Sequence, residues 1–120
     1  MEGRPRKSHQ ELVGDAHTYF EKKDELSRER CPIRGYTPDL YLCKRSQSGR
    51  LLKETVVEAE VTLDDIWRPH TRGQLRKARA YCCESRNLRT GVLVVPKEVE
   101  QDAKRMLGII RMKEIVVLAF

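Results

Sequence analysis

The run Thr55-Val56-Val57-Glu58-Ala59-Glu60-Val61-Thr62 is rich in β-branched residues and predicts a strand. Side chains alternate across a strand, so Glu58 and Glu60 share one face, while Val57, Ala59 and Val61 occupy the other. Two carboxylates on one face of an apolar strand are costly if they are buried, because like charges resist joint ionisation. The same face can instead be exposed to solvent, and the strand alone does not decide between these interpretations.

The residues before this strand predict a hairpin. A first strand is expected over residues 39–43, a turn at Ser46-Gln47-Ser48-Gly49, and the second strand over residues 51–62. Asp39 therefore begins the strand beside the one that carries Glu58 and Glu60, and it can supply a third carboxylate. A hard divalent cation such as Mg²⁺ or Mn²⁺ prefers oxygen ligands and would offset the repulsion among these acids.

The rest of the chain alternates helices and strands. Ser8-His9-Gln10-Glu11 fits a capping box and predicts a helix that begins near residue 9. Further patterns predict a short polar strand at about 26–31, a basic amphipathic helix at 72–84, a buried strand at 91–95, a helix at 97–108 and a strand at 114–120. The order α-β-β-β-α-β-α-β predicts an α/β fold, a mixed central sheet with helices on both faces.

Length and composition favour one domain. The chain has 120 residues, which we divide into a flexible basic arm at 1–7 and a single domain at 8–120. No apolar run approaches the ~18–20 residues that cross a bilayer. The first residues also lack the apolar stretch of a signal peptide. We therefore expect a cytoplasmic protein without a membrane partner.

Positive charge is concentrated in one segment. Residues 68–89 carry seven basic side chains and one acidic, an excess of six that equals the net charge of the whole chain. Localised positive charge suits a phosphate backbone, because each neutralised phosphate releases condensed counterions. The alternative is a solvated helix face. If the partner is nucleic acid, the expected contact residues are Arg68, Arg72, Arg76, Lys77 and Arg79.

Two motifs together resemble the signature of the PD-(D/E)XK nucleases. Gly35-Tyr36-Thr37-Pro38-Asp39-Leu40 is followed, nineteen residues after Asp39, by Val57-Glu58-Ala59-Glu60. The predicted order of elements also resembles the restriction-endonuclease-like core of this superfamily, including its archaeal Holliday-junction resolvases, over about residues 8–120. The resemblance implies that Asp39, Glu58 and the backbone carbonyl of Ala59 bind Mg²⁺ or Mn²⁺.

The resemblance adds two further residues. Glu11 occupies the place on the first helix where resolvase-like relatives carry an acid near the metal, although it is also the Glu of the capping box. Gln74 matches a helix residue that lines the site in recombination-type relatives.

One position departs from the family pattern, because Glu60 stands where the motif has lysine. Some branches of the family resemble this chain in carrying Glu there, as a general base or an extra metal ligand. A second alternative is a cation from elsewhere, such as Lys77, Arg76 or Lys53. The third is an inactive nuclease that still binds nucleic acid.

The resulting hypothesis is a metal-dependent nuclease that hydrolyses phosphodiester bonds, a structure-selective DNA endonuclease acting as a homodimer. Asp39, Glu58 and Glu60 would be its catalytic residues. The alternatives are a catalytically silent nucleic-acid-binding module on the same fold, and an interaction protein whose basic helix binds an acidic partner.

Overall fold

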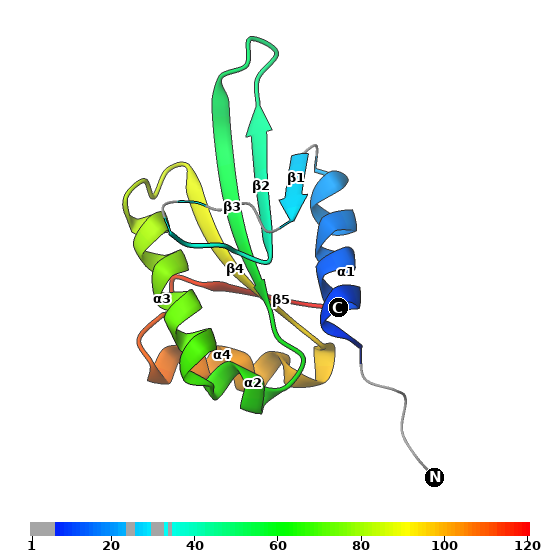
Figure 1. Ribbon diagram of the computed structural model, residues 1–120, viewed down its shortest axis with the longest axis vertical. Coiled ribbons are helices and arrows are strands. Elements are labelled where there is room, and N and C mark those ends of the chain that lie inside the picture. The colour runs from blue at the N-terminus through cyan, green and yellow to red at the C-terminus, as the bar shows by residue number, and fades with distance from the viewer. Residues whose placement is uncertain (1–6, 24–25, 30–32, 34) are drawn as a thin grey trace.

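A five-stranded mixed sheet forms the centre of the protein. The computed structural model describes residues 7–23, 26–29 (backbone only), 33 and 35–120. The strands lie in the order β1 (Leu26–Glu29), β2 (Leu40–Arg45), β3 (Leu51–Ala59), β4 (Arg89–Val95) and β5 (Val116–Ala119) (Figure 1). β2 pairs antiparallel with β1 and β3, whereas β4 runs parallel to β3 and β5.

Helices cover both faces of this sheet. The helices are α1 (His9–Glu21), α2 (Leu63–Trp67), α3 (Pro69–Cys83) and α4 (Glu100–Ile109), the last preceded by a 3₁₀ turn, η1 (Lys97–Val99). Figure 1 shows α1 on one side of the strands and α3 on the other. The predicted α/β architecture is confirmed. Among the described helices, none combines the length and apolar character that crossing a membrane requires.

The parallel strands follow from the connections. A hairpin joins β2 to β3, but α2 and α3 carry the chain from β3 to β4, and α4 carries it from β4 to β5. Such crossovers return the chain to the same end of the sheet, which makes the next strand parallel. The crossover helices also bury the apolar runs of β4 and β3 on the face opposite α1.

The core has two layers, and β3 contributes to both. Val57 and Ala59 pack with Leu12 and Ala16 of α1. Val56 packs with residues of α3 and α4 on the other face. The predicted alternation is therefore confirmed, and Glu58 lies on the same face as Val56 because two positions separate them.

Several element boundaries differ from the sequence prediction. β3 ends at Ala59 rather than Thr62, because Thr62 caps α2, a helix the sequence did not predict, with its hydroxyl accepting from Asp65 N at 3.1 Å. Five residues are too few to show helical periodicity. α3 begins at Pro69 instead of 72, and proline suits the first helical position because it has no N–H to satisfy.

Other boundaries move by a few residues at most. β2 begins at Leu40, one residue after Asp39, and the last strand covers Val116–Ala119 within the predicted 114–120. The capping box at Ser8 is confirmed. Residues 1–6 of the predicted basic arm and residues 30–31 of the predicted short strand lie outside the described part of the chain.

Candidate active site

The hairpin register brings Asp39 beside the acidic end of β3. Leu40 pairs with Val57, so Asp39, one residue earlier, lies next to Glu58 on the neighbouring strand. The Oδ2 atom of Asp39 accepts a hydrogen bond from the backbone N–H of Ala59 at 2.9 Å. The backbone of β3 therefore fixes the Asp39 carboxylate beside the end of that strand.

Glu58 is buried against both Asp39 and Tyr36. Glu58 is only 7% exposed, and the Tyr36 hydroxyl donates a hydrogen bond to Glu58 Oε2 at 2.6 Å. Burial raises the pKa of Glu58 to about 8, the charge of Asp39 adds to the rise, and the hydrogen bond from Tyr36 opposes it. In the cation-free protein at neutral pH, Glu58 is therefore mostly protonated.

Glu60 lies just beyond the end of β3 and contacts α3. Thr71 Oγ1 donates to Glu60 Oε2 at 3.3 Å. Burial raises the pKa of Glu60 to about 7, the Thr71 hydrogen bond lowers it, and the charges of Asp39 and Asp65 raise it. The three predicted acids thus influence one another electrostatically, so the structure brings them together at one end of the sheet.

Three contacts at this centre were not predicted from the sequence. Tyr36 binds Glu58, Thr71 binds Glu60, and His9 Nε2 lies 3.1 Å from Asp39 Oδ2. His9 is in the first turn of α1, thirty positions from Asp39. Side chains from different elements meet here, and periodicity within one element gives no signal for such contacts.

Glu11, in contrast, has the capping role that the sequence left open. It is exposed, and its Oε1 accepts from Ser8 N at 3.0 Å while Ser8 Oγ accepts from Glu11 N at 3.1 Å. The residue of α1 that contacts the acidic centre is His9.

The donor set suits a hard divalent cation. A carboxylate offers about four acceptor positions, so Asp39 keeps acceptor capacity after its contacts with Ala59 and His9. The N–H and C=O of one residue in an antiparallel strand point to the same edge. Because the Ala59 N–H points to Asp39, we expect its carbonyl on that side too.

No cluster of three His, Cys, Asp or Glu side chains stands at metal-binding spacing among the described residues. The set implied by the family resemblance needs only two carboxylates and one carbonyl, so this observation does not argue against it.

The predicted nucleic-acid contacts divide between two sides of α3. Gln74 Nε2 donates to Thr37 O at 3.2 Å, in the loop that leads to Asp39, and Lys77 lies one turn further along that side. Arg72, Arg76 and Arg79 follow one another at spacings of four and three on another side, where Arg79 Nε contacts Glu114 Oε2 at 3.2 Å.

These arginines differ in their contacts. Arg76 is exposed. The Nε atom of Arg72 is buried and has no hydrogen-bond partner in the described structure. Arg68, which precedes α3, pairs with Asp65 at 3.1 Å. Among these predicted contact residues, Gln74 is the one whose side chain bonds to the loop of Asp39 in the described structure.

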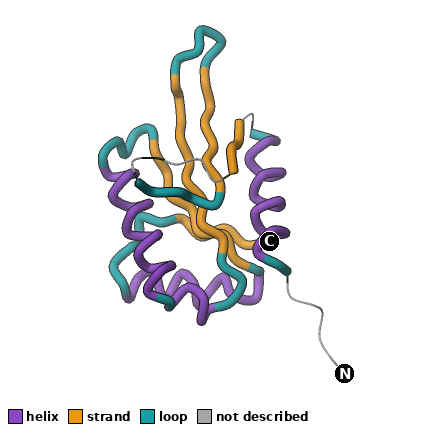
Figure 2. Tube along the Cα trace, viewed as in Figure 1, coloured by secondary structure: helices purple, strands orange, loops and turns teal. Residues whose placement is uncertain are grey.

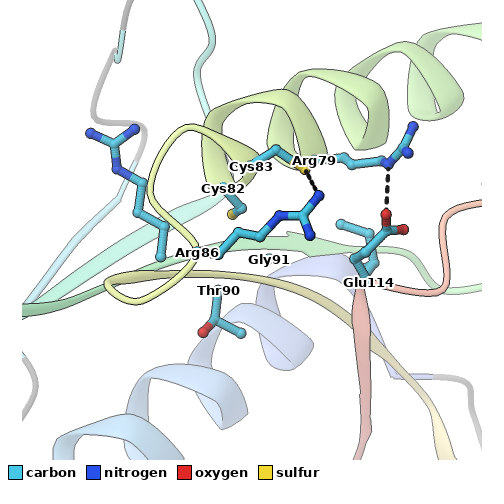
Figure 3. A pocket seen from close by; sticks show the side chains of 9 residues that line it. Arg79, Cys82, Cys83, Arg86, Thr90, Gly91 and Glu114 are labelled. Atoms are coloured by element: carbon cyan, nitrogen blue, oxygen red, sulfur yellow. Dashed lines mark hydrogen bonds and ion pairs between the residues drawn. The ribbon is translucent and has the colours of Figure 1, made fainter.

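A pocket of about 220 Å³ lies at the other end of α3, between that helix and the starts of β4 and β5 (Figure 3). Two of its three arginines face acids, and the third, Arg86, contacts Cys83 Sγ at 3.9 Å. Arg79 contacts Glu114, and Arg89 contacts Glu54 and Glu84, each at 3.0 Å. A pocket in which most arginines are already paired with acids is a weaker candidate than the acidic centre, where like charges meet.

The hydrogen bond from Tyr36 to Glu58 gives a direct test of these electrostatics. The Tyr36→Phe variant is expected to raise the pKa of Glu58 by about one pH unit, because the phenol stabilises the charged carboxylate. The measurement is an NMR titration of the carboxyl carbon. Tyr41→Phe is the matched control, since the Tyr41 hydroxyl donates to Glu54 at 2.6 Å. An unchanged Glu58 titration in Tyr36→Phe would contradict the observed contact.

Comparison with known proteins bears on the fold alone. No protein-family model and no curated protein matches this chain. Among solved structures, the chain is similar to the crystal structure of an XisH family protein from Nostoc punctiforme PCC 73102, with a TM-score of 0.55 and 16% sequence identity. The match covers 91% of this chain and 89% of that chain, so the two share their arrangement of helices and strands over nearly their whole lengths.

Proposed function

We propose that this protein is a divalent-metal-dependent nuclease that hydrolyses phosphodiester bonds in DNA. The observation that carries the proposal is that Asp39 lies beside Glu58, whose pKa is raised to about 8, first by burial and then by the charge of Asp39. Two carboxyls held together at this cost are typical of a site that receives a cation. The resemblance of both segments to the PD-(D/E)XK signature supports the same proposal.

Asp39, Glu58 and the carbonyl of Ala59 would hold Mg²⁺ or Mn²⁺. When bound, such an ion polarises a phosphoryl oxygen and lowers the pKa of a bound water. The chain's own contribution is to keep the two carboxylates in place, through the Ala59 N–H on Asp39 and the Tyr36 hydroxyl on Glu58.

Glu60 is proposed as the general base that takes the proton of the attacking water. A general base works best when its pKa lies near the working pH, and the pKa of Glu60 is raised to about 7. Thr71 fixes its Oε2 oxygen, which leaves Oε1 to accept the proton. This assignment gives Glu60 a function at the position where the motif has lysine.

The basic helix α3 is proposed to bind the DNA backbone, through Arg68, Arg72, Gln74, Arg76, Lys77 and Arg79. Contacts to phosphate position a protein without reading sequence. The proposed enzyme therefore recognises the shape of branched or otherwise structured DNA. We further propose a homodimer, because paired cuts in two strands need two active sites.

The test is cleavage of a labelled panel that contains duplex, single-stranded, flapped and four-way DNA, together with RNA. Each substrate is incubated with Mg²⁺, Mn²⁺ or EDTA. The expected result is cutting that requires a divalent ion, with a structured DNA preferred. Salt-sensitive binding without cutting under every metal would instead support the catalytically silent nucleic-acid-binding module. The observation that favours this alternative is Glu60, which stands where the motif has lysine.

A further inference from the structure

The β2–β3 hairpin extends beyond the rest of the sheet. β4 pairs with β3 over Glu54–Ala59, and β1 pairs with β2 over Leu40–Cys43. In the described ladders, residues 44–53 therefore pair only with one another. Figures 1 and 2 show this segment, which we call the ribbon, projecting past the ends of the helices.

The charge of the ribbon is of one sign. It contains Lys44, Arg45, Arg50 and Lys53 and no acidic residue. The register places Lys44 directly opposite Lys53. Like charges at directly opposite positions destabilise a strand pair, and an isolated two-stranded hairpin is marginally stable in water. The ribbon therefore concentrates positive charge on a pair of strands that no further strand covers in the described ladders.

The tip of the ribbon is nonetheless well organised. Ser46 N donates to Arg50 O at 2.8 Å, and Gly49 N donates to Ser46 O at 2.9 Å. Gly49 adopts a positive φ of 86°, which glycine tolerates without strain. Arg45 Nη1 donates to Gly49 O at 2.9 Å, so one of its five donors is used and others can bind an external acceptor. Two exposed arginines, Arg45 and Arg50, are thus held at either side of a fixed turn.

We propose that the ribbon binds the phosphate backbone of duplex DNA while the same duplex lies at the acidic centre. This inference rests on the proposed function for its choice of ligand. A phosphate beside Arg45 and Arg50, the two exposed arginines at the tip, would complement the positive charge that the ribbon concentrates there. The β-bulge between Lys44 and Arg45 supports the assignment, since bulges redirect the side chains that follow them.

The geometry sets the length of DNA that can reach both places. Arg50 precedes Glu58 by eight residues, which at ~3.4 Å per residue corresponds to about 27 Å. B-DNA rises by about 3.4 Å per base pair, so this distance equals roughly eight base pairs. A short duplex can occupy the acidic centre or the ribbon tip, whereas a long one can contact both.

The experiment compares binding of a DNA hairpin with a stem of about 6 bp and of a 30-bp duplex, by fluorescence anisotropy over a series of salt concentrations, because the first is shorter than the distance between the two places and the second is longer. The ribbon variant combines Lys44→Gln, Arg45→Gln and Arg50→Gln. The matched control combines Lys97→Gln, Lys104→Gln and Lys113→Gln, three exposed positions on and beside α4, at the opposite end of the molecule (Figure 1). Both variants lose the same charge.

The ribbon variant is expected to bind the 30-bp duplex about tenfold or more weakly. The slope of its log affinity against log salt concentration should correspond to about two to three fewer phosphate contacts. Its affinity for the stem of about 6 bp and its metal-dependent cleavage of that stem should change little, because so short a duplex cannot contact both places. The control should bind both duplexes within about twofold of the wild type. If the triple variant does not fold, Arg50→Gln alone, at the exposed tip, should reduce the salt dependence by about one contact.

Two results would overturn the inference and leave the nuclease proposal intact: wild-type affinity of the ribbon variant for the 30-bp duplex, or equal weakening in the control. If the ribbon variant aggregates but keeps its affinity for DNA, the inference fails as well. The charges of the ribbon would then serve to keep exposed strand edges from pairing with other chains. If the wild type binds neither duplex at low salt, the proposed function and the inference both fail.

Discussion

The Asp39→Asn variant is expected to lose metal-dependent cleavage by about a thousandfold while it keeps the wild-type fold. Asparagine has the same size and retains an oxygen that can accept the hydrogen bond from Ala59 N. What it lacks is the negative charge that would hold the cation. A metal ion contributes several kcal/mol to the stabilisation of a phosphoryl transition state, and each ~1.4 kcal/mol corresponds to a factor of ten in rate.

The rate is measured under single-turnover conditions on the best substrate of the panel, with Mg²⁺ and with Mn²⁺. Calorimetric titration with Mn²⁺ adds a readout that does not depend on activity, and the variant should lose the binding isotherm. Asp64→Asn is the control, because it removes the same charge from an exposed position on α2. Cutting by Asp39→Asn within about threefold of the wild type would place the catalytic centre elsewhere.

The Glu58→Gln variant is expected to stabilise the metal-free protein at pH 8 although it abolishes cleavage. Its effect should depend on pH in a defined direction. Between pH 4.5, the ordinary pKa, and about 8, the folded protein keeps a proton on Glu58 that the unfolded chain has released. Wild-type stability therefore falls as the pH rises through this window. Glutamine does not titrate, so the advantage of the variant grows from about pH 5 to pH 8 and then levels off.

We expect a gain of about 2 kcal/mol at pH 8, or roughly 5–10 °C in Tm, and little difference at pH 5. Thermal unfolding in EDTA across this pH range measures it. Mg²⁺ should narrow the difference at pH 8, because an ion that binds only the folded wild type stabilises it. Glu98→Gln, on the exposed surface of η1, is the control and should show no such pH dependence. A variant less stable than the wild type at pH 8 would show that ionising Glu58 carries no penalty in the metal-free protein.

The order of helices and strands and the pairing of Asp39 with the end of β3 could be predicted from the sequence. Both depend on local rules, since alternation assigns Glu58 to one face and a turn at residues 46–49 returns the chain beside itself. The contacts of Tyr36, Thr71 and His9 could not be predicted, because each joins residues from different elements. The division of α3 into two sides likewise depends on how that helix lies on the sheet.

The charge of the ribbon could not be predicted for a different reason. Residues 31–67 carry five basic and six acidic side chains, so the segment as a whole is nearly neutral. Four of the five basic residues lie within residues 44–53, and three of the acids are Asp39, Glu58 and Glu60. The hairpin places the basic residues at one end and the acidic residues at the other. The net charge of the whole segment does not reveal this separation.

The bulge between Lys44 and Arg45 also determines where this chain can change length during evolution. A one-residue insertion between Leu40 and that bulge, or in the facing part of β3, would shift the register and turn side chains to the wrong face, which would separate Asp39 from Glu58. Beyond the bulge the pairing is already irregular, and the turn at residues 46–49 can accept added residues without disturbing the ladder below it. Homologues with the same acidic centre should therefore differ in the length of their hairpin tips while residues 40–43 and 54–57 keep a constant register.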